Sequence, residues 1–144
     1  MISMPQFGYA FQNYDKTKHV RASIREKDIS HKHAREIAIA IKGRSLEKAR
    51  ELLENVIALR EAIPYRRYNN EVAHRSNIRD GFFAGRFPKK AAYEFLRILD
   101  NLESNAEYKG MDLDRLRIVS AAVSQRHKAE AVSTTSNGQI KPQV

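Results

Sequence analysis

The chain has 144 residues, and its 26 Lys and Arg residues against 17 Asp and Glu residues give a formal net charge of +9. This length suits one domain with a modest core, and this charge favours a polyanionic partner, either nucleic acid or an anionic membrane surface. The sequence contains no apolar run near the roughly 18 residues that span a bilayer, no signal-peptide pattern and no cysteine for disulfides or thiolate metal sites. We therefore expect a cytoplasmic protein.

The N-terminal part predicts an extended arm followed by a strand. Residues 1–18 have no helical or strand period, but they carry four aromatic residues between Phe7 and Tyr14. Over residues 20–25, apolar and polar side chains alternate. A period of two suits a strand that is buried on one side.

Two helices are expected next, from the spacing of their apolar residues. Between Ser30 and Gly43 these recur at i, i+3, i+4 and i+7, the stripe of an amphipathic helix. Ser30 is a plausible N-cap, and Gly43 is well placed to end the helix. Ser45 can cap a second helix with the same spacing, and Pro64 marks its limit.

A third helix and a second strand complete the expected domain. Pro88 fits the first turn of the helix and Gly110 its end. Residues 115–123 then predict a strand with Leu116 and Ile118 facing inward. The order of strand, three helices and strand indicates an α+β domain in which three helices pack on a small antiparallel sheet.

The last residues differ in composition from the rest of the chain. Residues 124–144 are rich in Ser, Thr, Asn and Gln and nearly lack large apolar side chains. Such a segment cannot bury enough surface to order itself. We therefore divide the chain into an arm (1–18), a globular domain (19–123) and a polar tail (124–144).

The segment that joins the second and third helices indicates a function. It has no helical or strand period, and a long loop of this kind is usually functional or disordered. Between Pro64 and Lys90 only Glu71 and Asp80 oppose seven basic residues. These are Arg66, Arg67, Arg75, Arg79, Arg86, Lys89 and Lys90, and the aromatic residues among them are Tyr65, Tyr68, Phe82, Phe83 and Phe87.

This composition favours nucleic acid, and folded RNA in particular. Lys and Arg neutralise phosphates and release counterions, and aromatic and guanidinium planes stack on the unpaired bases that folded RNA supplies. Asn69 and Asn70 add amide groups for base edges or the 2′-hydroxyl. Lys89 and Lys90 oppose the dipole of the third helix unless an anion lies there, which favours a bound phosphate. The alternative is that the phenylalanines pack under the loop as a small satellite core.

Two other classes of protein find less support. A helix-turn-helix DNA-binding regulator could place its two helices around Gly43–Ser45, but its recognition helix would then present Glu47 and Glu54 to phosphates. An enzyme is not indicated, because His31 and His33 point in different directions at a helix start and no carboxylate completes a metal set. We expect no catalytic residues, no metal and no cofactor.

Three stretches resemble a known family. IPYRRYNN (Ile63–Asn70), GFFAGRFPKKAA (Gly81–Ala92) and NLESNAEYKGMDLDRLRI (Asn101–Ile118) are similar to the archaeal and eukaryotic branch of large-subunit ribosomal protein twenty-two. The resemblance covers roughly residues 8–118. It implies an α+β domain on the large ribosomal subunit that binds several domains of the large rRNA and contacts neighbouring ribosomal proteins. It also implies a place near the polypeptide exit tunnel, a role in assembly and no catalytic activity.

The resemblance and the composition of the loop together select the RNA-binding candidates. The loop supplies Arg66, Arg67, Tyr68, Asn69, Asn70, His74, Arg75, Arg86, Lys89 and Lys90. Lys32 and Lys42 of the first helix are further candidates.

The C-terminal end departs from the family pattern. In the family, the last strand continues into a long basic β-hairpin with an Arg-Ala-Xaa-Gly-Arg type segment that reaches the tunnel wall. Residues 119–144 contain no such segment, and Arg126, His127 and Lys128 are too few to replace it. We therefore expect either that the hairpin is missing or remodelled, with the polar tail in its place, or that the given end differs from that of the native protein.

Overall fold

The computed structural model describes residues 13–25, 27–78, 81–125, 131–134 and 140–143. The aromatic residues Phe7, Tyr9 and Phe11 of the expected arm lie outside these ranges, as do Arg126, His127 and Lys128. The helices are α1 (His31–Ile41), α2 (Leu46–Ile57) and α3 (Lys89–Tyr108), with a short 3-10 helix η1 (Leu113–Arg115). The strands are β1 (Ile63–Pro64), β2 (Gly85–Arg86), β3 (Ala131–Thr134) and β4 (Ile140–Gln143).

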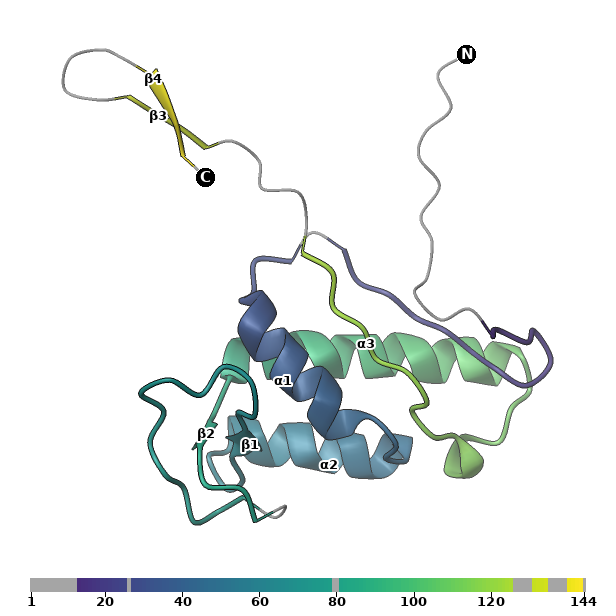
Figure 1. The fold of residues 1–144 in the computed structure, drawn as a ribbon. Coiled ribbons are helices and arrows are strands. Elements are labelled where there is room, and N and C mark those ends of the chain that lie inside the picture. Colours follow the sequence, from purple (N-terminus) through teal and green to yellow (C-terminus); the bar gives the residue numbers. More distant parts are fainter. Residues whose placement is uncertain (1–12, 26, 79–80, 126–130, 135–139, 144) are drawn as a thin grey trace.

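The three expected helices are confirmed, together with the α+β class (Figure 1). Ser45 precedes α2, and its hydroxyl accepts a hydrogen bond from the backbone N–H of Lys48 at 3.4 Å. Ser30 occupies the N-cap position of α1 with extended backbone but makes no side-chain cap bond. Gly43 has φ +85° after α1, a conformation that glycine adopts without the strain of a Cβ.

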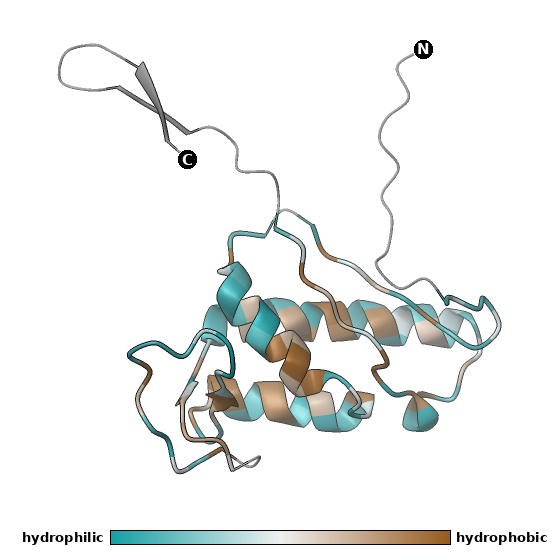
Figure 2. Cartoon of the chain, in the orientation of Figure 1, coloured by the Kyte–Doolittle hydropathy of each residue, from teal (hydrophilic) through white to brown (hydrophobic). Residues whose placement is uncertain are grey.

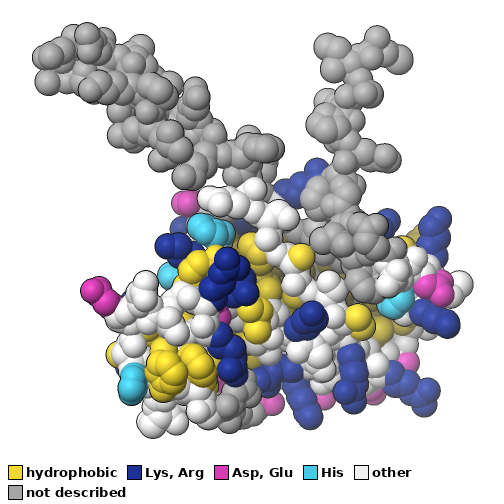
Figure 3. Space-filling view, viewed as in Figure 1, with side chains coloured by type: hydrophobic (Ala, Val, Ile, Leu, Met, Phe, Trp, Pro, Cys, Tyr) yellow, Lys and Arg dark blue, Asp and Glu magenta, His cyan; other side chains and the backbone are white. Residues whose placement is uncertain are grey.

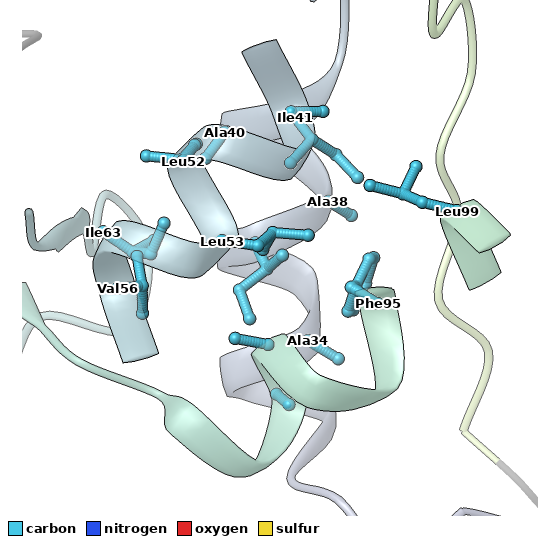
Figure 4. Packing of buried hydrophobic residues seen from close by; sticks show 14 of the residues in the cluster. Ala34, Ala38, Ala40, Ile41, Leu52, Leu53, Val56, Ile63, Phe95 and Leu99 are labelled. Atoms are coloured by element: carbon cyan, nitrogen blue, oxygen red, sulfur yellow. The ribbon is translucent and has the colours of Figure 1, made fainter. Parts of the chain in front are cut away.

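The core lies between the helices, where α3 packs against both α1 and α2. In Figure 2 the first turns of α1 are hydrophilic and its later turns are hydrophobic, where it crosses the other two helices. Figure 4 shows the residues that meet there, including Ile41 from α1, Leu53 and Val56 from α2, and Phe95 and Leu99 from α3. All five are buried. The expected apolar stripes are therefore the surfaces that hold the domain together.

The first expected strand is wrong, although its burial pattern is right. Val20, Ala22 and Ile24 are half-buried and alternate with exposed residues at positions 21, 23 and 25, but residues 20–25 form no strand. The segment instead runs along α3 in the opposite direction: Asn105 donates to the Arg21 carbonyl at 2.9 Å, and Lys27 pairs with Glu94 at 3.7 Å. Burial on one side therefore comes from a helix surface, which produces the same alternation as a sheet.

The second expected strand is reduced to an isolated bridge. Arg117 pairs with Ser45, and the Ile118 backbone exchanges hydrogen bonds with the turn between α1 and α2, donating to the Arg44 carbonyl (2.9 Å) and accepting from Gly43 N–H (2.6 Å). Ile118 is buried and Leu116 half-buried, so their inward orientation is confirmed. The segment closes the domain over the α1–α2 turn and joins no sheet.

The small sheet lies in the loop for which no strand was expected. β1 and β2 pair antiparallel, with Ile63 opposite Arg86 and Pro64 opposite Gly85. Strands of two residues are too short to show a period in the sequence.

A second antiparallel pair, β3 with β4, lies in the C-terminal tail. The polar composition predicts no strand there, but strand pairing uses backbone hydrogen bonds and does not require a hydrophobic pattern.

The division of the chain into arm, domain and tail remains a prediction.

Candidate nucleic-acid interface

The loop between α2 and α3 is ordered by its own backbone pairing. Beyond β1 and β2, His74 bridges to Ala84, and the backbone N–H of Arg75 donates to the Phe83 carbonyl at 2.9 Å. Gly85 permits this close approach, because a Cβ there would lie 2.6 Å from Ile78 Cδ1 and 3.1 Å from the Ile63 carbonyl oxygen. The pairing therefore holds basic residues from both ends of the loop in one region.

A buried carboxylate on α1 fixes the first basic residues of this loop. Glu36 is 1% exposed, and it accepts hydrogen bonds from three consecutive backbone N–H groups. The donors are Arg66 at 3.0 Å, Arg67 at 3.1 Å and Tyr68 at 3.3 Å. Hydrogen bonds to an ionised acceptor are the stronger kind, and the Arg35 guanidinium lies 3.4 Å from the same carboxylate.

The sequence did not identify Glu36 as a functional residue. Its partners are backbone groups 30 to 32 positions away, and such a contact leaves no trace in local spacing. Glu36 anchors the backbone of residues 66–68, and the side chains of Arg66 and Arg67 on this segment are exposed. The structure thus assigns a positioning role to a residue that makes no surface contact.

Tyr65 and Tyr68 lie in different environments. Tyr65 is 2% exposed and belongs to the core, and burial raises the pKa of its hydroxyl. It is therefore not available for base stacking. Tyr68 is half-buried, and three cations surround its ring with 5.6–5.8 Å between the charged group and the ring centroid. They are Lys32, Arg35 and Arg67, so α1 and the loop contribute to one cluster.

This cluster borders a shallow hollow. The hollow has a volume of about 440 Å³ and lies between α1, the loop and residues 121–125. Its lining combines His31, Arg35 and Arg67 with apolar side chains such as Ile39 and Val123. A lining that combines cationic and apolar side chains suits a ligand that has both an anionic and an apolar part.

A second group of aromatic and cationic side chains covers the other end of the loop. The rings of Phe82 and Phe83 stack with centroids 4.5 Å apart, and the Arg66 guanidinium lies 4.9 Å from the Phe82 centroid. The His74 ring lies 5.2 Å from that of Phe83, and the Arg75 guanidinium 5.4 Å from that of Phe87. Phe83 is 52% exposed, so the satellite-core interpretation is wrong for this residue.

The remaining candidates of the loop and of the start of α3 are mostly exposed. Arg86, Lys89, Lys90 and Asn70 are exposed and Asn69 is half-buried. Lys90 lies 3.5 Å from Asp28 in an exposed ion pair, and such pairs contribute little to stability. Lys42 follows the last turn of α1, at the opposite end of that helix from Lys32, so it is not brought into either group.

Arg86 also affects a histidine on α1. Burial lowers the pKa of His33, and the positive charge of Arg86 lowers it further. The His33 ring lies 5.7 Å from that of Tyr65. His33 thus favours its neutral form under the basic surface.

Figure 3 shows the charge on one face of the molecule. Lys and Arg side chains are spread over it, and Asp and Glu are few and lie mainly at its edges. The exposed acidic residues of α2, Glu47, Glu51 and Glu54, belong to the helix that a helix-turn-helix protein would insert into DNA. They would repel phosphates there.

The other classes of site find no support in the described ranges. Within them, no group of three or more His, Cys, Asp or Glu side chains is arranged to hold a metal ion. None of the described helices is both long enough and apolar enough to cross a membrane.

The chain is similar to proteins of known family. The profile of the family described as Ribosomal protein L22p/L17e matches residues 22–143. Three archaeal proteins named Large ribosomal subunit protein uL22 are similar to this chain. The protein of Nitrosopumilus maritimus is 62% identical over 120 residues, which are 83% of this chain and 78% of the relative.

The other two relatives extend the comparison. The protein of Cenarchaeum symbiosum is 61% identical over 118 residues, 82% of this chain and 76% of its own length. The protein of Archaeoglobus fulgidus is 42% identical over 141 residues, 98% of this chain and 90% of its own length. The matched residues continue beyond Ile118, where the motifs in the sequence end. The chain belongs to the Ribosomal protein L22p/L17e family.

Proposed function

We propose that this chain binds large-subunit rRNA through the loop between α2 and α3 and the adjoining surface of α1. As a member of a ribosomal protein family, the chain is a structural protein of the large ribosomal subunit in the cytoplasm, and it is not an enzyme. The finer proposal adds contact with rRNA and neighbouring ribosomal proteins, support of subunit assembly and a place near the polypeptide exit tunnel.

One observation carries the rRNA-binding proposal. Exposed basic residues lie over aromatic rings in two groups: Lys32 and Arg67 at Tyr68, and Arg66 at the stacked pair of Phe82 and Phe83. Cations supply the phosphate contacts that dominate affinity, and aromatic rings supply the stacking surfaces that unpaired bases need. Regular duplex DNA offers phosphates but no unstacked bases. The arrangement therefore favours folded RNA.

The globular residues 19–123 are proposed to carry this binding. The loop, Glu36 and the core that supports them all lie inside that range. The tail, with its β3–β4 pair, would then add to the binding without being required for it.

Binding of the full chain to isolated large-subunit rRNA tests the proposal. We expect much tighter binding to this RNA than to duplex DNA of equal length at the same salt concentration, and co-sedimentation with large subunits. Equal affinity for both nucleic acids would reduce the interface to a general polyanion surface and contradict the proposal. Binding of a dimer to a single preferred DNA site would instead support the alternative function, a helix-turn-helix DNA-binding regulator.

A further inference from the structure

Phe82 and Phe83 form an aromatic pair, with Phe82 half-buried and Phe83 exposed, and the proposed function leaves the specific role of this pair open. The rings stack at 4.5 Å with 27° between their planes, and Phe83 is 52% exposed. A phenylalanine has no polar group to favour contact with water, so this exposure forfeits about half of the free energy that full burial would provide. An exposed aromatic ring on a loop of fixed conformation is well suited to contact a binding partner.

The pair is held in place from several directions. The backbone carbonyl of Phe83 accepts the Arg75 N–H at 2.9 Å, and the next residue, Ala84, bridges to His74. The guanidinium of Arg66 lies over Phe82, and the imidazole of His74 lies beside Phe83. Binding to a surface that is already ordered loses little conformational entropy.

The charges around the pair select the kind of partner. Arg66, Arg75 and Arg86 are exposed in the same loop, and Glu71 is the acidic residue among the described positions 65–90. In Figure 3 hydrophobic side chains gather at the surface in the region of this loop, with Lys and Arg side chains nearby. A partner that is flat and apolar in one part and anionic in the next matches both features. An unpaired nucleotide has this composition.

We propose that the exposed surface of Phe83, supported from behind by Phe82, stacks on an unpaired base of the rRNA, whose flanking phosphates contact the loop arginines. This inference rests on the proposed rRNA binding and assigns a base-stacking site within it. Stacking on an aromatic side chain tolerates any base, because every base has a π-face. The site therefore recognises an unstacked position in the RNA and not a particular sequence.

Substitution of Phe83 in the full chain tests the inference, with large-subunit rRNA as the ligand. Alanine substitution at stacking positions removes about 1–3 kcal/mol per base, so Phe83→Ala should raise Kd roughly 5- to 150-fold. Phe83→Leu should weaken binding nearly as much, because leucine has no aromatic ring to stack on a base, although it keeps much of the apolar area. Phe83→Tyr keeps the ring and should keep most of the affinity. The slope of log Kd against log salt should stay unchanged, because the arginines that neutralise the phosphates are still present.

Tyr108→Ala is the matched control. Tyr108 is an exposed aromatic residue at the last turn of α3, the end of that helix opposite Lys89. Equal Kd values for Phe83→Ala, Tyr108→Ala and the wild type would overturn the stacking site while leaving rRNA binding intact. Retained affinity in Phe83→Leu would also overturn it, since general apolar contact would then suffice. Failure of the wild type to bind rRNA would instead overturn the proposed function itself.

Discussion

Glu36 determines where the first basic residues of the loop lie, although it contacts no solvent. Its carboxylate joins α1 to the backbone of residues 66–68 through three hydrogen bonds. Arg66 and Arg67 are consecutive and both exposed, and without this anchor their backbone would have many conformations. Order in the loop thus comes from inside the protein before any RNA is bound.

Replacement of Glu36 should separate loop order from loop charge. Glu36→Ala leaves three N–H donors without their ionised acceptor, and we expect it to lower the free energy of unfolding by at least about 1.5–3 kcal/mol, the contribution of hydrogen bonds to a charged group. Amide hydrogen exchange at residues 66–68 should accelerate. The exposed Glu54→Ala on α2 is the control. Unchanged exchange in Glu36→Ala would contradict the anchoring role.

The consecutive residues Arg66 and Arg67 should account for part of the salt dependence of RNA binding. Arg66→Ala combined with Arg67→Ala should reduce the slope of log K against log salt by about 0.7–0.9 for each phosphate that the protein no longer neutralises. Lys48→Ala combined with Arg97→Ala removes the same net charge from exposed positions on α2 and α3. If this control pair lowered the slope equally, binding would depend on total charge and not on the loop.

Among the elements, α2 and α3 are joined by an ion-pair cluster as well as by the core. Arg50 lies 2.8 Å from Asp100 and 2.9 Å from Glu103, and its side chain is 29% exposed. The carboxylates of Asp100 and Glu103 raise the pKa of Arg50. Both of these carboxylates belong to α3, so the ion pairs join the two helices.

Loss of this cluster should weaken the packing of the two helices. We expect Arg50→Ala to lower the free energy of unfolding by about 1 kcal/mol, less than a buried charged hydrogen bond because solvent reaches the pair. A double-mutant cycle with Asp100→Ala measured by denaturant unfolding should give a favourable coupling energy. A coupling energy of zero would mean that the ion pair does not stabilise the packing of α2 on α3.

The helices could be predicted from the sequence, but the strands could not. The helices were predictable because their apolar stripes, caps and terminal glycines are local signals, as for Ser45 and Gly43. The strands were not, because residues 20–25 alternate against a helix, and β1 and β2 are too short for any period. Most RNA-binding candidates could be identified from composition, whereas Glu36 and the burial of Tyr65 depend on tertiary contacts.

For the molecule as a whole, stability should respond to acid through His33. Burial and the Arg86 charge lower its folded pKa below the ordinary value of about 6.5. As pH falls through this region, the unfolded state takes up a proton that the folded state resists, so stability decreases. The loss begins below about pH 6.5 and ends below the folded pKa.

Replacing His33 should remove that part of the pH dependence. We expect His33→Gln to show a smaller fall in melting temperature between about pH 7.5 and pH 5.5 than the wild type. His74→Gln changes an exposed histidine and serves as the control. If the melting temperature of His33→Gln fell as much as that of the wild type, other groups would govern the response to acid.

The protein places its charges differently on different surfaces. The loop and α1 carry exposed cations and aromatic rings, whereas α2 exposes glutamates and turns Arg50 toward α3. A net charge of +9 alone would favour contact with RNA everywhere. We predict that the arrangement of the side chains favours RNA contact through the loop and α1 over contact through α2.

Ultraviolet crosslinking of native large subunits, with the modified peptides mapped by mass spectrometry, tests the proposed interface most directly. We predict rRNA adducts on peptides from the loop between α2 and α3, above all at the aromatic residues Tyr68 and Phe83, and few on the outer surface of α2. Adducts concentrated on α2 with none in the loop would contradict the proposed interface.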